Sequence, residues 1–265
     1  MSCILESPTD PNIIEPCYNF VLQYMNRPEL IENIFDALGE CIQSSRRLKN
    51  LSLNNGVLEF SEKIAVSEDV NPLVRAQAVS FFRKLLDWEE SLTYQHVTVE
   101  FLMAISNLLE YQIPQVQEIT ILAIIQLSLN CSIGMRILQA GIVTKLMGIL
   151  SADLPYKVKI SASLLSAALL CEENVNLAMK VYEATFDIAF ELLLSSDHEN
   201  WQMHALDSLL KFTATIEAHG LAQASQLTEK KWLVEIIDEL VESQVPRVSD
   251  LARHLRETVF ANVSE

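Results

Sequence analysis

The chain has 265 residues, of which 50% are hydrophobic and 20% are charged, and its formal net charge is −16. Such a composition is that of a folded chain with a sizeable core rather than of a disordered one. The excess of acidic residues argues against nucleic acid binding, because contacts to phosphates need clustered lysine and arginine. The same charge would suit a basic partner.

No targeting or membrane segment is indicated. Residues 1–6 lack the positive start and apolar stretch of a secretory signal. The longest uncharged run, 119–135, includes Gln126 and Asn130 and is shorter than the roughly 20 apolar residues that cross a bilayer. The five cysteines are spread along the chain without a C-x-x-C pair, as is usual in a reducing compartment. We therefore expect a cytoplasmic or nuclear protein without a membrane segment.

The chain begins with a proline-containing stretch, residues 1–27, which we expect to be an N-terminal arm. After this stretch a sequence motif recurs at nearly constant spacing. It consists of a proline, an anchor residue two or three positions later, and then the apolar face of a helix. The five anchors are Val74, Val116, Val158, Trp201 (whose copy lacks the proline) and Val248, at spacings of 42, 42, 43 and 47 residues. A proline ahead of the anchor suits a helix start, where its missing N–H costs nothing.

The periodicity continues beyond each anchor. Four, seven and eleven residues later come small or apolar side chains, which trace one stripe of an α-helix. The residue at the fourth position is Ala78, Thr120, Ala162, Ala205 or Ala252. Such small residues let a neighbouring helix approach closely, so these stripes predict helices that pack against one another.

Each anchor helix follows another apolar segment, at 57–65, 99–109, 142–150, 186–194 and 233–241. The unit is thus at least a helical hairpin, and residues 133–140 and 175–182 predict a short third helix ahead of it. Gly141 and Gly56 are placed as left-handed terminators, and Ala184 occupies the corresponding turn after residues 175–182. Strand patterns are essentially missing.

Two further expectations concern the end of the repeats. Residues 214–228 make the last spacing longer and predict an insertion or loosened loop. Residues 247–261 carry many charges, as the outer face of a capping repeat requires. The middle anchor helices, 119–129 and 160–170, are apolar on nearly every side, which predicts helices covered from both directions.

The stretch Asn130 to Val143, with Leu146, Val158 and Ala162 beyond it, resembles an armadillo repeat, and Pro72-Leu73-Val74-Arg75 with Ala78 resembles the related HEAT pattern. The resemblance covers residues 28–261 and implies one all-α domain, a right-handed α-α superhelix of about five to six repeats. Residues 262–265 are left as a tail. Nuclear-import armadillo proteins carry a ladder of W-x-x-x-N on the groove helices. Here Ala205, and not Asn, follows Trp201 at that distance.

No catalytic, metal or cofactor motif is found. The five histidines do not pair at metal-ligand spacing, and neither a glycine-rich phosphate loop nor G-x-S-x-G occurs. We therefore expect no enzyme and no cofactor, an enzyme with unfamiliar motifs being the remaining alternative.

One position, directly after each anchor, is polar in all five copies: Arg75, Gln117, Lys159, Gln202 and Ser249. In stacked repeats a shared position forms a row, and a polar row could hold the backbone of an extended peptide. The alternative is that an exposed neighbour of a core position is simply polar. A second candidate, the basic cluster Arg46, Arg47 and Lys49, is interpreted as a solvated surface.

These patterns favour a non-enzymatic interaction module, a scaffold or adaptor that binds a partner protein or extended peptide along its concave groove. The alternative is an armadillo-like nucleotide exchange cofactor of a chaperone, an idea that rests on analogy of fold and size alone.

Overall fold

The computed structural model describes residues 31–87, 90–130, 133–172, 174–220 and 223–260. These residues form α-helices and one 3-10 helix, with no strand among them. The predicted arm, 1–27, and the predicted tail, 262–265, lie outside the described residues.

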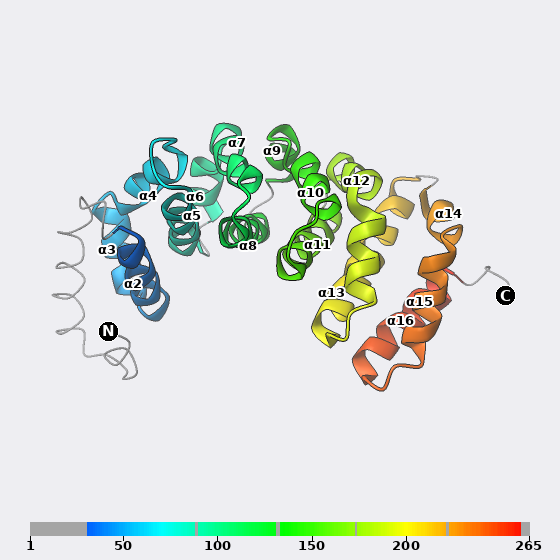
Figure 1. The fold of residues 1–265 in the computed structure, drawn as a ribbon. Helices are drawn as coiled ribbons and strands as arrows, with labels where there is room; N and C mark the ends of the chain where they lie inside the picture. The colour runs from blue at the N-terminus through cyan, green and yellow to red at the C-terminus, as the bar shows by residue number, and fades with distance from the viewer. Residues whose placement is uncertain (1–30, 88–89, 131–132, 173, 221–222, 261–265) are drawn as a thin grey trace.

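The helices are arranged in two rows that bend into an arch (Figure 1). The inner row, on the underside of the arch in this view, consists of α2 (Ile31–Ser44), α5 (Pro72–Leu86), α8 (Pro114–Asn130), α11 (Tyr156–Leu170), α13 (Glu199–Ala218) and α16 (Pro246–Thr258). The outer row consists of α4 (Val57–Val66), α7 (Val99–Ser106) with the 3-10 helix η3 (Asn107–Glu110), α10 (Ile142–Ser151), α12 (Val175–Leu194) and α15 (Lys231–Val241). The shorter helices α3 (Arg46–Asn54), α6 (Glu90–His96), α9 (Gly134–Gln139) and α14 (Gln223–Thr228) precede outer-row helices.

Each inner helix packs on the inner helix of the next unit, and each outer helix packs likewise along the outer row. Val116 and Val158 therefore lie on neighbouring helices, α8 and α11, as the repeat spacing predicts. Since no single pair of helices can bury both its faces, stacking on neighbouring pairs creates the core. The all-α solenoid is confirmed.

The buried stripe of the anchor helices matches the sequence pattern closely. All five small residues four positions after the anchors are buried, as are Phe81, Ala123, Leu165, Ser208 and Leu255 at the seventh position. Of the anchors themselves, Val116, Val158 and Val248 are buried, whereas Val74 and Trp201 are half-buried. The stripe thus begins one helical turn later in these two copies.

The predicted prolines and glycines lie at helix starts. Pro72, Pro114 and Pro246 are the first residues of their helices, and Pro155 is the N-cap of α11. Gly56 and Gly141 both have φ +71° and join a short helix to α4 and α10. The sharp turn at these two positions needs a residue without a Cβ.

One prediction about a local break is wrong. Residues 175–182 do not end at Ala184, because α12 continues without interruption from Val175 to Leu194. Alanine favours the right-handed helix where glycine in the other copies allows a turn. Of the two alternatives expected for residues 214–228, the described part shows an insertion rather than a loosened loop: α13 runs to Ala218, and α14 follows Gly220 as an additional short helix.

The central helices differ from each other. α11 is buried over most of its surface, as expected, but α8 leaves Leu122 43% and Leu129 72% exposed. α8 is covered from both directions along the row, by α5 and by α11, as predicted, and the exposed leucines lie on a further side that neither neighbour covers. At the C-terminal end, the exposed Arg253, His254 and Glu257 give α16 the polar surface that was expected of a cap.

Candidate functional site

The polar row that directly follows the anchors, which was predicted to bind a peptide, is mostly buried. Arg75, Gln117 and Ser249 are buried, and Lys159 and Gln202 are half-buried. The expectation of an exposed row is therefore wrong at the first three of these positions. The physical reason is that this side of the inner helix lies against the end of the preceding outer helix, whose carbonyl groups these side chains contact.

Three of these side chains donate hydrogen bonds to carbonyl groups at the end of the preceding outer helix. The pairs are Gln117 Nε2 with Leu109 O at 2.9 Å, Gln202 Nε2 with Leu194 O at 3.2 Å and Ser249 Oγ with Val241 O at 2.6 Å. The last carbonyls of a helix have no partner within the helix. A polar residue eight positions later in the chain supplies the missing donor, so the recurring polarity has a structural cause.

Arg75 extends the same arrangement across two units. Its Nε donates to Ala65 O on α4 at 3.0 Å, and its Nη2 donates to Ala104 O on α7 of the next unit at 3.3 Å. The side chain is only 2% exposed. A buried guanidinium thereby joins two successive outer helices.

The basic cluster near the N-terminus of the described chain is divided in the same way. Arg46 and Arg47 are exposed at the start of α3, as expected of a solvated surface. Lys49 is buried and its ammonium group donates to the carbonyl of Asp87. The ammonium group of Lys49 therefore contacts the end of α5 instead of solvent.

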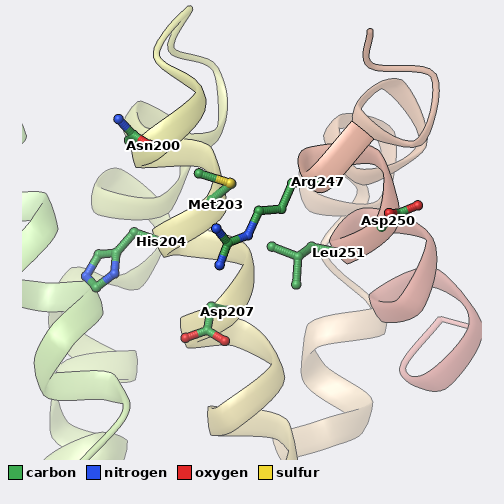
Figure 2. Close-up of a pocket in the computed structure, with 7 residues that line it drawn as sticks. All are labelled: Asn200, Met203, His204, Asp207, Arg247, Asp250 and Leu251. Carbon is green, nitrogen blue, oxygen red and sulfur yellow. The ribbon is translucent and has the colours of Figure 1, made fainter. Parts of the chain in front are cut away.

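Solvent-facing positions on the inner row lie at other offsets, and they enclose a cavity of about 480 Å³ between α13 and α16 (Figure 2). Asn200 and Arg247 directly precede the anchors of these two helices, and Asp207 lies six positions after Trp201. The remaining lining residues are Met203, His204, Asp250 and Leu251. Positions one before and two, three and six after the anchor therefore face the cavity. Sequence reasoning missed this register, although the residue before the anchor is polar in four copies, Gln115, Lys157, Asn200 and Arg247.

Figure 2 shows the guanidinium of Arg247 reaching from α16 toward α13, above the carboxylate of Asp207. The thioether of Met203 and the side chain of Leu251 form the apolar part of the same cavity. Charged and apolar groups thus alternate along one side of the inner row. Such a surface can contact both the backbone and the side chains of a protein segment.

The pKa values of two titratable side chains on α13 are shifted by their surroundings. The hydrogen bond from Lys211 Nζ to Asp207, whose ion-pair distance is 2.7 Å, raises the pKa of Lys211. Partial loss of hydration lowers the pKa of His204, because a charged imidazolium is disfavoured there. The lowered pKa favours the neutral imidazole of His204, which offers both a donor and an acceptor.

The middle of the inner row is apolar. Leu122 and Leu129 occupy the exposed side of α8, and Leu122 lies six positions after its anchor, as Asp207 does on α13. Beside them, Lys157 Nζ on α11 and Glu118 Oε1 on α8 form an ion pair of 2.8 Å. An exposed apolar patch is thus bordered by a charged bridge between neighbouring helices.

Residues at the N-terminal ends of α11 and α13 form a half-exposed aromatic cluster. The ring centroid of Trp201 lies 6.3 Å from that of Tyr156 and 4.2 Å from that of His198. His198 is the N-cap residue of α13.

Within the described ranges, no group of three or more His, Cys, Asp or Glu residues is placed to hold a metal ion. In the same part of the chain, no helix has the length and apolarity needed to span a membrane.

Comparisons with known proteins show similarity of structure alone. No protein-family model matches the chain, and no curated protein matches it by sequence. Among solved structures, an engineered protein from a structural genomics consortium has a TM-score of 0.73 and 16% identity, covering 92% of this chain and 98% of that one. A designed armadillo repeat protein has a TM-score of 0.70 and 18% identity, covering 90% and 98%. Another designed armadillo repeat protein, solved in complex with the peptide (KR)4, has a TM-score of 0.65 and 16% identity, covering 89% and 97%. The chain has an armadillo-like helical-repeat fold.

Proposed function

We propose that this protein is a non-enzymatic scaffold or adaptor that binds an extended segment of a partner protein along the inner row of helices. The observation that carries the proposal is the exposed apolar side of α8, formed by Leu122 and Leu129, in the middle of a concave row. Large side chains left exposed together on a folded surface are typical of interaction sites.

Polar groups within this patch and farther along the inner row suit recognition of a peptide backbone. Gln126 is exposed on α8, and the cavity between α13 and α16 offers the amide of Asn200 and the neutral imidazole of His204. We propose a segment with apolar side chains over α8 and hydrogen bonds at the C-terminal units. The net charge of −16 favours basic residues elsewhere in the segment.

The fold comparison supports the class of function. A designed protein of the same fold was solved with a peptide of lysine and arginine. In the present chain, Arg75, Gln117 and Ser249 would hold such a groove in shape, because each joins an inner helix to the outer helix before it by a hydrogen bond. Of the originally expected row, the half-buried Lys159 and Gln202 are the members we propose to lie at the margin of the interface.

The test is co-purification from the source cell with the wild-type chain and two variants. Leu122→Asp places a charge in the patch on α8, whereas Ile188→Asp places one on the outer helix α12, where the residue is 39% exposed compared with 43% for Leu122. We expect Leu122→Asp to abolish capture of the partner and Ile188→Asp to leave it unchanged. Capture that survives Leu122→Asp, with both variants folded by circular dichroism, would refute binding over α8.

A further inference from the structure

Two cavities recur along one edge of the solenoid, where outer helices turn into inner helices. The first is about 520 Å³ and is lined by Glu68, Arg75, Asn107, Glu110 and Tyr111. The second is about 700 Å³, and its lining includes Glu110, Gln117, Ile149, Ala152 and Asp153. Each residue of the second set lies 42 residues after its counterpart in the first, because 117 − 75 and 153 − 111 both equal 42. The same cavity is therefore repeated in successive units, with different side chains.

In the first cavity the chain supplies its own guanidinium. Arg75 satisfies a carbonyl of its own unit, Ala65 O, and one of the next unit, Ala104 O. Glu68 and Glu110 lie at the same cavity and offset the positive charge. The first cavity therefore shows that this edge of the solenoid can accommodate a guanidinium group.

In the second cavity the shorter Gln117 takes the place of Arg75. Its Nε2 donates to Leu109 O of its own unit, which fixes the orientation of the amide. Its Oε1 has no hydrogen-bond donor among the described residues, although the side chain is only 4% exposed. A buried acceptor without a donor is costly, because the hydrogen bond it would make to water is lost without replacement. Gln117 lines the cavity, and its amide lacks one hydrogen-bond donor from the described part of the chain.

The rest of the lining favours a cationic donor. Asp153 is exposed at the cavity, and the nearby Lys145 is already engaged by Glu110 Oε1 at 3.0 Å and by Asn107 Oδ1 at 2.7 Å. Two carboxylates against one ammonium leave a net negative charge. Ile149 and Leu154 supply apolar wall for an aliphatic stem.

Gly148 keeps the cavity open. It lies within α10, yet a Cβ built on it would meet no atom within 4 Å. A larger side chain there would extend into the cavity and would occupy space without removing any hydrogen-bonding group. This position gives a way to close the site.

We propose that the cavity lined by Gln117, Gly148 and Asp153 binds the guanidinium of an arginine side chain from a partner protein. The guanidinium donates to Gln117 Oε1 and pairs with the carboxylate of Asp153, while its stem lies against the apolar wall. It occupies in the second unit the role that Arg75 has in the first. The site lies at the edge and does not depend on peptide binding along the inner row.

The test uses N-acetyl-arginine N-methylamide and ¹⁵N-labelled protein in an NMR titration. We expect saturable shifts of the Gln117 side-chain amide and the Gly148 backbone N–H. The citrulline analogue, which has the same shape without the charge, should bind at least about tenfold more weakly, since hydrogen bonds from charged groups are stronger by about 1–1.5 kcal/mol. Equal shifts from the citrulline or lysine analogue, or no shift at Gln117, would overturn the assignment.

Three variants separate this site from the rest of the surface. Gln117→Arg provides the guanidinium from within the chain, and Gly148→Leu fills the cavity; either should abolish the shifts. Asp153→Asn should weaken binding by about two- to fivefold, as for an exposed ion pair. Glu183→Gln, an exposed change on α12, is the matched control for charge. Unchanged binding by folded Gln117→Arg and Gly148→Leu would disprove the proposal, whereas Leu122→Asp should leave the shifts intact whatever its effect on the inner row.

Discussion

Arg75 on α5 donates from Nη2 to the carbonyl oxygen of Ala104 on α7 at 3.3 Å, so a single side chain connects two successive helical units. Its Nε simultaneously donates to Ala65 O on the outer helix of its own unit. In a solenoid each unit contacts only its neighbours. A bridge of this kind therefore contributes to the interface between units, on which the stability of the whole arch depends.

Replacing Arg75 with leucine should lower the free energy of unfolding by about 3 kcal/mol. The variant loses two hydrogen bonds from a charged donor, one to the buried Ala65 and one to the half-buried Ala104. Urea unfolding followed by circular dichroism measures the effect. Arg253→Leu, on the exposed side of α16, should change stability by less than about 0.5 kcal/mol. Equal effects of the two substitutions would contradict the bridging role.

Ser249→Ala tests the hydrogen bond at the end of α15. Ser249 Oγ donates to Val241 O at 2.6 Å, and the serine is buried. We expect a loss of about 1–2 kcal/mol, because the variant loses this hydrogen bond and the one that Arg253 Nη2 donates to Ser249 Oγ at 3.2 Å. The same urea experiment on Ser91→Ala, an exposed serine of α6, is the control and should show a change near zero. A neutral result for Ser249→Ala would mean that water replaces the hydroxyl without cost.

The sequence pattern predicted the stacking of the inner helices because the relevant information is local. A proline ahead of the anchor and small residues four positions later specify both where a helix begins and which side it buries. Ala162 and Ala205, for example, are both fully buried. Burial at these positions follows from the helical period alone.

The polar row could not be assigned from the same pattern. Whether Gln117 or Ser249 faces solvent depends on the angle between two consecutive helices and on the length of the side chain. The helical period of 3.6 residues gives neither this angle nor the reach of the side chain. The uninterrupted α12 is a different case: the repeat alignment suggested a turn at Ala184, but alanine favours the helix, so the residue type itself indicated the outcome.

Two glycines seven residues apart should respond to alanine in opposite directions. Gly141 has φ +71° at the start of α10, so Gly141→Ala should cost about 1–2 kcal/mol from the left-handed backbone. Gly148 lies inside the helix with open space around it, so Gly148→Ala should stabilise by about 0.5–1 kcal/mol. Urea midpoints of the two variants, measured with the wild type, give the comparison. A shift of both midpoints in the same direction would contradict this account of α10.

Tyr182 provides a prediction at alkaline pH. Its ring is packed between Phe186 and Phe212, with centroid distances of 4.9 and 5.3 Å. Loss of hydration, with smaller contributions from Asp187 and Glu229, raises the pKa of Tyr182 to about 12 from its ordinary value of 10.

Because the phenol loses its proton more readily in the unfolded chain, ionisation favours unfolding. The stabilising effect of the protonated phenol is complete below pH 10, falls as the pH rises from about 10 to about 12, and is absent above that range. Tyr182→Phe cannot ionise, so its free energy of unfolding should fall less steeply than that of the wild type over this interval. Urea unfolding at several pH values measures the slope, and Tyr156→Phe, which removes an exposed phenol, is the matched control. If wild type and Tyr182→Phe lose stability in parallel between pH 10 and 12, the phenol of Tyr182 is not held protonated by the outer row.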